Sequence, residues 1–280
     1  MTEAVGFLAA IISMIFWGSF LVPMKRIKNY DPFFFQLLMC AAIFVTSVAI
    51  SLFYGAFSFS YLGLISGLVW SLANILSILA VRSSGLSRAA PIWMGVGIFM
   101  SFAWGMLFFN EPLSSISFGV LGIILLIAGI SLISSTSESR KSSAKGMLLA
   151  VITGVLGGSY LVPLKMATTN PETFLLPLAT GILAGGIIIS LIKKPKIERR
   201  IILPGVLSGA LWNIANFSSF FAILGLGMAV GFPLTQMSLF VSILWGIFYF
   251  REMTEKNKII LLIVGSVVLF AGAVILALSL

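Results

Sequence analysis

Long runs of apolar residues, separated by short polar connections, occupy almost the whole chain. Each run has about 20 residues, the length of helix that crosses roughly 30 Å of hydrocarbon. Because backbone groups in lipid must be bonded within their own segment, the runs predict transmembrane helices. The weak ten-residue alternation of a membrane β-barrel is not seen. The ten predicted spans are 4–24, 32–54, 61–81, 87–109, 115–133, 145–164, 172–192, 201–223, 228–250 and 258–279.

The polar interruptions recur at a nearly fixed distance. Segment 18–25 reads GSFLVPMK and segment 158–165 reads GSYLVPLK, 140 positions later. Trp70 is matched by Trp212 at an offset of 142. A register that holds within two residues over most of the chain indicates a duplicated structural unit.

The duplication predicts two halves of opposite orientation. The one long polar, Ser-rich stretch, SSTSESRKSSAK, lies at the midpoint, so we expect a first repeat over 1–133, a cytoplasmic linker over 134–144 and a second repeat over 145–280. Each repeat has five spans, and an odd number makes the second repeat enter from the other side. Inverted repeats are typical of secondary transporters, whose substrate sites lie near the bilayer midplane at the repeat interface.

Composition and charge agree with a membrane carrier. Apolar residues make up 60% of the chain, charged residues only 9%, and the net charge is +9. All but one of the 17 lysines and arginines fall in alternate connections, and the exception is Lys165. The positive-inside rule therefore predicts that these connections are cytoplasmic and that both termini are extracytoplasmic. The excess positive charge suits contact with anionic lipid headgroups, and we expect no nucleic-acid partner.

Three segments carry a family resemblance. They are FWGSFLVPMK at 16–25, DPFFFQLLMC at 31–40 and GLVWSLAN at 67–74. Together they resemble the drug/metabolite transporter superfamily, in particular its sugar-uptake branch of glucose/ribose porters and related eukaryotic transmembrane proteins. The resemblance extends over essentially the whole chain, and it implies a ten-span carrier of five plus five helices.

Uncharged polar and aromatic residues inside the spans are the candidate substrate-binding residues. Amides and hydroxyls can both donate and accept hydrogen bonds from a sugar, and an indole offers a flat apolar surface. Intramembrane polar groups usually face the bundle interior, although hydrogen bonding between helices is the alternative role. Trp104 and Trp245 lie nearer span ends, which favours packing or interface anchoring. The candidates are Trp17, Gln36, Trp70, Asn74, Trp93, Ser159, Tyr160, Trp212, Asn213, Asn216 and Gln236.

Prolines and a pair of lysines are the candidate hinge and gate residues. Proline removes a backbone donor and interrupts a helix, and its occurrence at equivalent positions of both repeats favours hinges. Lys165 matches Lys25, so the two lysines would stabilise opposite gates or steer an anionic group; inheritance without a present role is the alternative. The hinge and gate candidates are Pro23, Lys25, Pro91, Pro163, Lys165 and Pro233.

The residue types and motifs that the sequence lacks limit the transport mechanisms that we expect. The chain has no histidine, and its eight acidic residues lie at span ends or in loops, so the usual mid-membrane proton relay is missing. This favours facilitated diffusion or exchange. We expect Glu111 and its counterpart Glu252 to cap or brace the hairpins between spans 4 and 5 and between spans 9 and 10; titration of Glu3 or of this pair near an entrance is the alternative. Phosphate-binding, cofactor and metal motifs are also missing, so we expect no cofactor, no ATP-driven pumping and no enzyme activity.

The sequence thus predicts an all-α, multi-pass cell-membrane protein that moves a small neutral metabolite, in first place a monosaccharide, by alternating access. Spans 1, 3, 4, 6, 8 and 9 would surround the cavity. An exporter of drugs or amino acids from the same superfamily is one alternative, and a channel is another. The expected partners are the substrate and the lipid bilayer, and a homodimer is left open.

Overall fold

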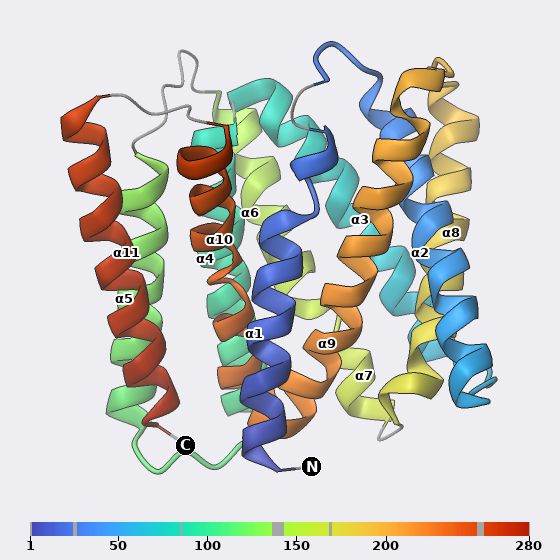
Figure 1. Cartoon of the computed structure of the whole chain (residues 1–280). Helices are drawn as coiled ribbons and strands as arrows, with labels where there is room; N and C mark the ends of the chain where they lie inside the picture. Colours follow the sequence, from blue (N-terminus) through green and yellow to red (C-terminus); the bar gives the residue numbers. More distant parts are fainter. Residues whose placement is uncertain are drawn as a thin grey trace.

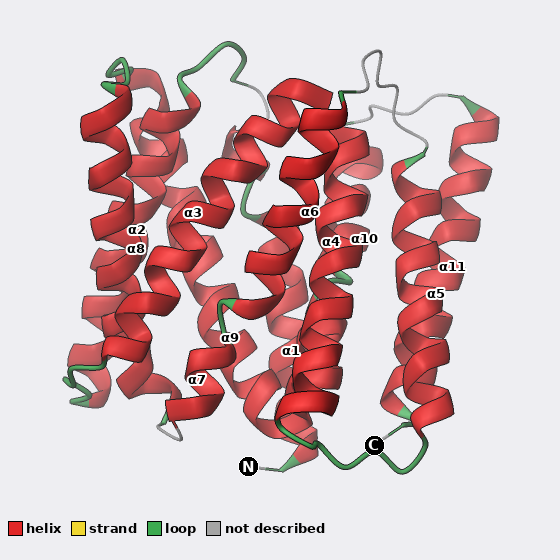
Figure 2. Ribbon diagram, turned by 180° about the vertical axis from the view of Figure 1, so that it is seen from behind, coloured by secondary structure: helices red, strands yellow, loops and turns green. Residues whose placement is uncertain are grey.

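The computed structural model describes residues 2–24, 27–84, 86–135, 143–167, 170–250 and 255–279. Within these ranges the chain is helical, with no strand (Figures 1 and 2). The elements in chain order are α1 (Glu3–Ser19), η1 (Val22–Met24), α2 (Pro32–Tyr54), α3 (Tyr61–Ser84), α4 (Leu86–Ala103), η2 (Trp104–Phe108), α5 (Ile116–Ser134), α6 (Ala144–Ser159), α7 (Val162–Ala167), α8 (Pro171–Lys193), η3 (Arg199–Ile201), α9 (Ile202–Thr235), α10 (Ser238–Leu244), η4 (Trp245–Tyr249) and α11 (Lys256–Ala277).

The helices have the length and composition of membrane spans, which confirms the predicted all-α membrane class. Eight helical stretches in the described ranges are long and apolar enough to cross a bilayer, and a shorter apolar stretch covers Ile92–Phe108. The longest, Arg199–Ser242, has 44 residues and is broken at Gly227, whose φ of 80° and ψ of 167° are not helical. In Figure 1 the two termini lie at the same, lower end of the bundle, which we call the terminal face.

The repeated GS-x-LVP segments end helices in both halves. Helix α1 ends at Ser19 and the 3-10 turn η1 follows it, while α6 ends at Ser159 and the short helix α7 begins at Val162. Pro23 and Pro163 lie directly after these breaks, where the ring cannot donate a hydrogen bond to the preceding turn. The same local sequence thus produces the same interruption twice.

A second pair of irregular segments also follows the repeat. Helix α4 passes into the π-helical turn η2, which starts at Trp104, and α10 passes into the π-helical turn η4, which starts at Trp245. The sequences are WGMLF and WGIFY. Single π-helical turns inside α-helices are rare and are found frequently at functional sites.

Small residues allow the central helices to approach closely. A Cβ on Gly67 of α3 would overlap the backbone of α8, and a Cβ on Gly209 of α9 would overlap α2 at Met39 and Ala42. Such contacts are typical of helix packing in membranes. Because Gly67 and Gly209 are repeat equivalents, glycines at matching positions allow α3 to pack closely on α8 and α9 to pack closely on α2. Helices α5 and α11 pack on each other at the side of the bundle (Figure 1).

Candidate functional site

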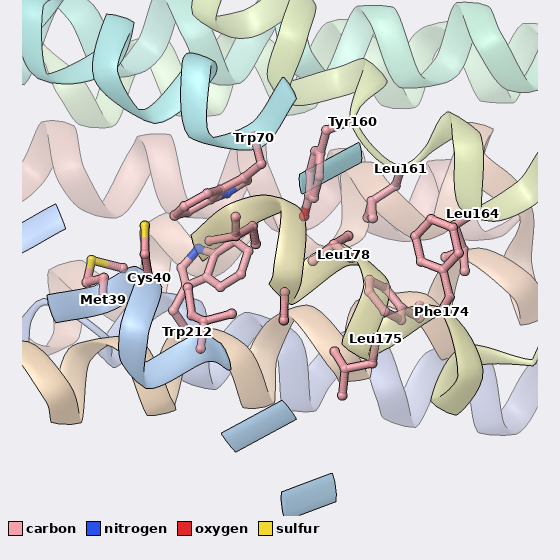
Figure 3. Packing of buried hydrophobic residues seen from close by; sticks show 14 of the residues in the cluster. Met39, Cys40, Trp70, Tyr160, Leu161, Leu164, Phe174, Leu175, Leu178 and Trp212 are labelled. Carbon is pink, nitrogen blue, oxygen red and sulfur yellow. The ribbon is translucent and has the colours of Figure 1, made fainter. Parts of the chain in front are cut away.

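Two repeat-equivalent tryptophans meet inside the bundle. The ring centroids of Trp70 on α3 and Trp212 on α9 are 4.5 Å apart, with an interplanar angle of 53°. Both side chains are buried, and Figure 3 shows them in one cluster with Tyr160. Trp17 on α1 lies 6.3 Å from Trp212, measured between ring centroids. The structure therefore brings three of the predicted site tryptophans together.

Trp70 and Trp212 are also counterparts in the sequence repeat, at an offset of 142. Their contact joins α3 to α9, which come from different halves of the sequence. We call Trp17, Trp70 and Trp212 the tryptophan cluster.

A buried hydrogen bond joins two other candidates beside this cluster. The Tyr160 hydroxyl, directly after the end of α6, donates to Asn216 Oδ1 over 2.8 Å, and both side chains are buried. Asn216 lies one helical turn from Trp212 on α9, so its amide is on the same face. Its Nδ2 is buried without a protein partner, and so is Trp17 Nε1. These two N–H groups are suited to donate to a hydroxyl-bearing ligand.

Asn213 and Gln36 instead connect helices. Asn213 Nδ2 on α9 donates to Thr46 Oγ1 over 2.9 Å and to Ser47 Oγ over 3.0 Å, both on α2. Gln36 Nε2 on α2 lies 3.4 Å from the Ser71 carbonyl on α3. In both residues the amide oxygen is buried without a protein partner, so each retains one acceptor.

The remaining candidates lie in less central positions. Asn74 on α3 is half-buried, and Gln236 caps the end of α9 with its Nε2 3.4 Å from Thr235 Oγ1. Trp93 on α4 packs with Leu149 and Ala150 in a small separate cluster. The structure does not join Trp93 to the tryptophan cluster, and its role in binding stays a prediction.

Ser159 takes part in a hydrogen bond that the sequence did not suggest. Trp104 Nε1 donates to Ser159 Oγ over 2.8 Å, and the repeat-equivalent Trp245 Nε1 donates to Ser19 Oγ over 2.8 Å. Trp104 and Trp245 were expected to pack or to anchor at the interface. Trp104 does pack against the main hydrophobic cluster, and both tryptophans also bond the serine of the GS segment in the other half.

The predicted hinge prolines lie at or near irregular backbone. Pro23 and Pro163 follow the breaks after α1 and α6, and Pro233 lies inside α9, six residues after the break at Gly227. Pro91 lies in α4, and its side chain is outside the described part of the chain. Lys25 and Glu252 also lie outside the described residues.

Lys165 has a specific partner. Its Nζ forms an ion pair with Glu111 and lies 4.8 Å from the centroid of the Phe109 ring. Glu111 is nearly buried and also accepts hydrogen bonds from the backbone N–H groups of Met228, over 2.7 Å, and Ala229, over 2.8 Å. From the sequence, Glu111 is expected to cap or brace its hairpin, or to titrate near an entrance, and its pairing with Lys165 is not predicted. The repeated glutamate after each π-helical segment was the available signal.

Within the described residues, no group of three or more His, Cys, Asp or Glu side chains could hold a metal ion. An open crevice of about 190 Å³ between α1, the end of α9 and α11 is almost wholly apolar; its lining includes Phe7, Met14 and Met237. This lining offers a sugar no hydrogen-bonding partners, so the crevice is unlike the region around the tryptophan cluster.

Comparison with known proteins identifies the family. The family model described as "Sugar transport protein" matches residues 8–279. The chain belongs to the sugar transport protein family. The resemblance to sugar-uptake carriers seen in the sequence is confirmed, and the chain is a multi-pass integral protein of the cell membrane.

Members of the sugar transport protein family resemble this chain from end to end. The glucose uptake protein GlcU of Bacillus subtilis is 28% identical, over 97% of this chain and 98% of its own length. The probable glucose uptake protein GlcU of Priestia megaterium is also 28% identical, over 96% of this chain and 98% of its own. One crystal structure matches with a TM-score of 0.81 at 14% identity, over 98% of this chain and 96% of that one. That match shows the fold.

Proposed function

We propose that this chain carries a neutral monosaccharide across the cell membrane by alternating access. The observation that carries the proposal is the contact of Trp70 with Trp212, which brings indole surfaces from α3 and α9 together. Asn216, Tyr160 and Trp17 add amide, hydroxyl and indole N–H groups around these surfaces. Family membership and the names of the relatives, which are glucose uptake proteins, support a sugar as substrate.

The proposed topology is ten spans in two inverted repeats, over 1–133 and 145–280, joined by a polar cytoplasmic linker over 134–144. The break at Gly227 supports this count, because it divides Arg199–Ser242 into two crossings, and α4 with η2 supplies a further one. An even number of crossings agrees with termini at the same end of the bundle (Figure 1). The distribution of lysine and arginine supports an extracytoplasmic terminal face.

An exporter of drugs or amino acids would bind its substrate at a different place in the molecule. A drug-like or apolar substrate would favour the apolar crevice lined by Phe7, Met14 and Met237 over the polar groups near the tryptophan cluster. A channel would need a water path open at both ends. The part-buried ion pair between Glu111 and Lys165 of α7, which lies at the terminal face (Figure 1), supports a carrier that is closed on one side.

Uptake of radiolabelled glucose into proteoliposomes tests the proposal. The variants Trp70→Phe and Trp212→Phe each replace an indole in the cluster, and Trp93→Phe is the matched control because Trp93 packs elsewhere. We expect saturable uptake that falls about fivefold in the two cluster variants, since each aromatic contact contributes on the order of 1 kcal/mol. Full uptake in both cluster variants, or equal loss in the control, would refute the site. Transport of amino acids or cationic drugs in place of sugars would support the exporter alternative.

A further inference from the structure

The carboxylate of Glu111 joins segments that are far apart in the chain. Glu111 follows η2 in the first half, whereas its ion-pair partner Lys165 on α7 and its donors Met228 and Ala229 belong to the second half. A Cβ added at Gly227 would lie 2.5 Å from Glu111 Oε2, so the glycine leaves room for the carboxylate.

The electrostatics of this arrangement favour a stable closure. Met228 and Ala229 follow the break at Gly227, so their N–H groups have the free, positive character of a helix start. The Lys165 ammonium adds a full charge, and the Phe109 ring covers it. Only 9% of the Glu111 side chain is exposed, so water weakens these interactions little.

A second pair of contacts differs between the two halves. Ser66 Oγ on α3 donates to the Tyr160 carbonyl at the end of α6. The repeat equivalents are Ser208 on α9 and Phe20 at the end of α1. Ser208 Oγ is buried without a protein partner. Each pair joins the two halves of the chain, and the hydrogen bond is made by Ser66 with Tyr160 but not by Ser208 with Phe20.

The inference rests on the proposed function, transport by alternating access. Under that mechanism, the difference between the two serines distinguishes two states of the carrier. In an inverted-repeat carrier, a contact between the halves in one state should be replaced in the opposite state by the contact between the repeat-equivalent residues. Ser66 with Tyr160 is thus a contact of the present state, whereas Ser208 with Phe20 is a contact of the opposite state.

We propose that Glu111, Lys165 and the N–H groups of Met228 and Ala229 form the latch that closes the terminal face, with Ser66 supporting it. Opening this face requires Glu111 to leave the second half. The Ser208 hydroxyl then bonds the Phe20 carbonyl as the other face closes.

Thiol labelling with a membrane-impermeant reagent tests the latch without any substrate. Cys40 is the only cysteine in the chain and is buried, so a Cys40→Ala background leaves a single reporter. Met228→Cys is that reporter. Met228 is fully buried beside the latch, and a cysteine at this position still has the backbone N–H that donates to Glu111. Phe57→Cys, in the exposed loop after α2, reports reagent access to the same face.

In intact cells, Glu111→Gln and Lys165→Met should each raise the labelling rate of the Met228→Cys thiol about tenfold, because each removes a charge-assisted contact of the closed state. Glu172→Gln is the matched control, since Glu172 is another carboxylate near the terminal face, at the start of α8. Phe57→Cys should label at one rate in every background. Unchanged labelling in both latch variants would overturn the proposal.

Substitutions of Ser66 and Ser208 should change the labelling rate in opposite directions. Ser66→Ala should raise the labelling rate of the Met228→Cys thiol, whereas Ser208→Ala should lower it, because the second change weakens the open state. An equal effect of both serine changes would overturn the exchange of contacts. Labelling does not involve sugar, so a parent chain that moves no sugar but shows these shifts would refute the substrate and retain the latch. Normal sugar uptake with unchanged labelling would refute the latch and retain the sugar as substrate.

Discussion

Trp104 donates its indole N–H to Ser159 over 2.8 Å, and Trp245 donates to Ser19 over the same distance. In each bond the tryptophan belongs to one half of the chain and the serine to the other. Both bonds exist in one structure, unlike the contact of Ser66, which has no equivalent at Ser208. A contact that forms in only one state of a carrier would not occur together with its repeat equivalent. Because the two Trp–Ser bonds do occur together, they are suited to persist in both states while other parts of the two halves move.

Trp104→Phe and Trp245→Phe should therefore destabilise the protein by similar amounts. Each change removes one hydrogen bond between helices, which contributes about 0.6 kcal/mol in a membrane protein. Thermal unfolding in detergent, followed by fluorescence, measures the effect, and the double variant should show the sum. A large loss from one variant and none from the other would show that only one of these bonds matters in solution.

Tyr160→Phe should cost more than an ordinary surface change. It leaves the buried Asn216 Oδ1 without its 2.8 Å donor, at a cost of about 1–3 kcal/mol. Tyr61→Phe is the control, because Tyr61 is 71% exposed. The same unfolding measurement applies. Equal stability of the two variants would mean that another donor replaces the hydroxyl.

Gly227→Ala tests the backbone at the break in α9. A φ of 80° disfavours any residue with a Cβ by about 1 kcal/mol or more, and the Cβ would also meet Glu111. Gly157→Ala, inside α6, is the opposite case, because a Cβ there meets nothing within 4 Å and should stabilise the helix by up to about 1 kcal/mol. We expect opposite shifts in the unfolding temperature of the two variants. Shifts of the same sign would contradict the geometry.

A pH effect is expected at the connection between α8 and α9. The Arg200 guanidinium, followed by the Asp31 backbone N–H, holds the pKa of Glu198 below its ordinary value of 4.5. A lowered pKa means that the folded state prefers the ionised carboxylate. The resulting stabilisation is present above pH 4.5 and is lost as the pH falls through the lowered pKa.

Unfolding of the parent chain and of Glu198→Gln between pH 7 and pH 3 checks this sign. The parent should be the more stable at pH 7, and the difference should shrink toward the acid end. A difference that grows with acidification would contradict the stated direction of the pKa shift.

The sequence predicted the class of this fold because its signals are local. Apolar runs of membrane length report the helices directly, and the GS-x-LVP segments mark the breaks at Ser19 and Ser159. The connection predicted between spans 201–223 and 228–250 falls where α9 breaks at Gly227. The positive φ of Gly227 and its close approach to the Glu111 carboxylate, 116 residues earlier in the chain, were not predicted, because they depend on packing between distant segments.

The site was harder to predict, because residue type alone does not tell which polar group faces a ligand and which joins two helices. Asn213 and Asn216 lie three positions apart on α9, yet the first bonds α2 and the second bonds Tyr160. Trp70 and Trp93 have the same chemistry, but of these two only Trp70 packs against Trp212. Such distinctions depend on how the helices are rotated, which no single segment specifies.

The contact of Trp70 with Trp212 has a consequence for the sidedness of transport. Because each tryptophan is the counterpart of the other, a ligand that arrives from either side of the membrane meets nearly the same indole surfaces. Tyr160 breaks this equivalence, since its counterpart Phe20 lacks the hydroxyl. The dissociation constants at the two faces should then differ by about one hydrogen bond, which is of the order of fivefold. Under the proposed alternating access without an energy source, unequal dissociation constants require that the equilibrium between the two facing states differ between the empty and the sugar-bound carrier. The direction of net flux still follows the sugar gradient alone.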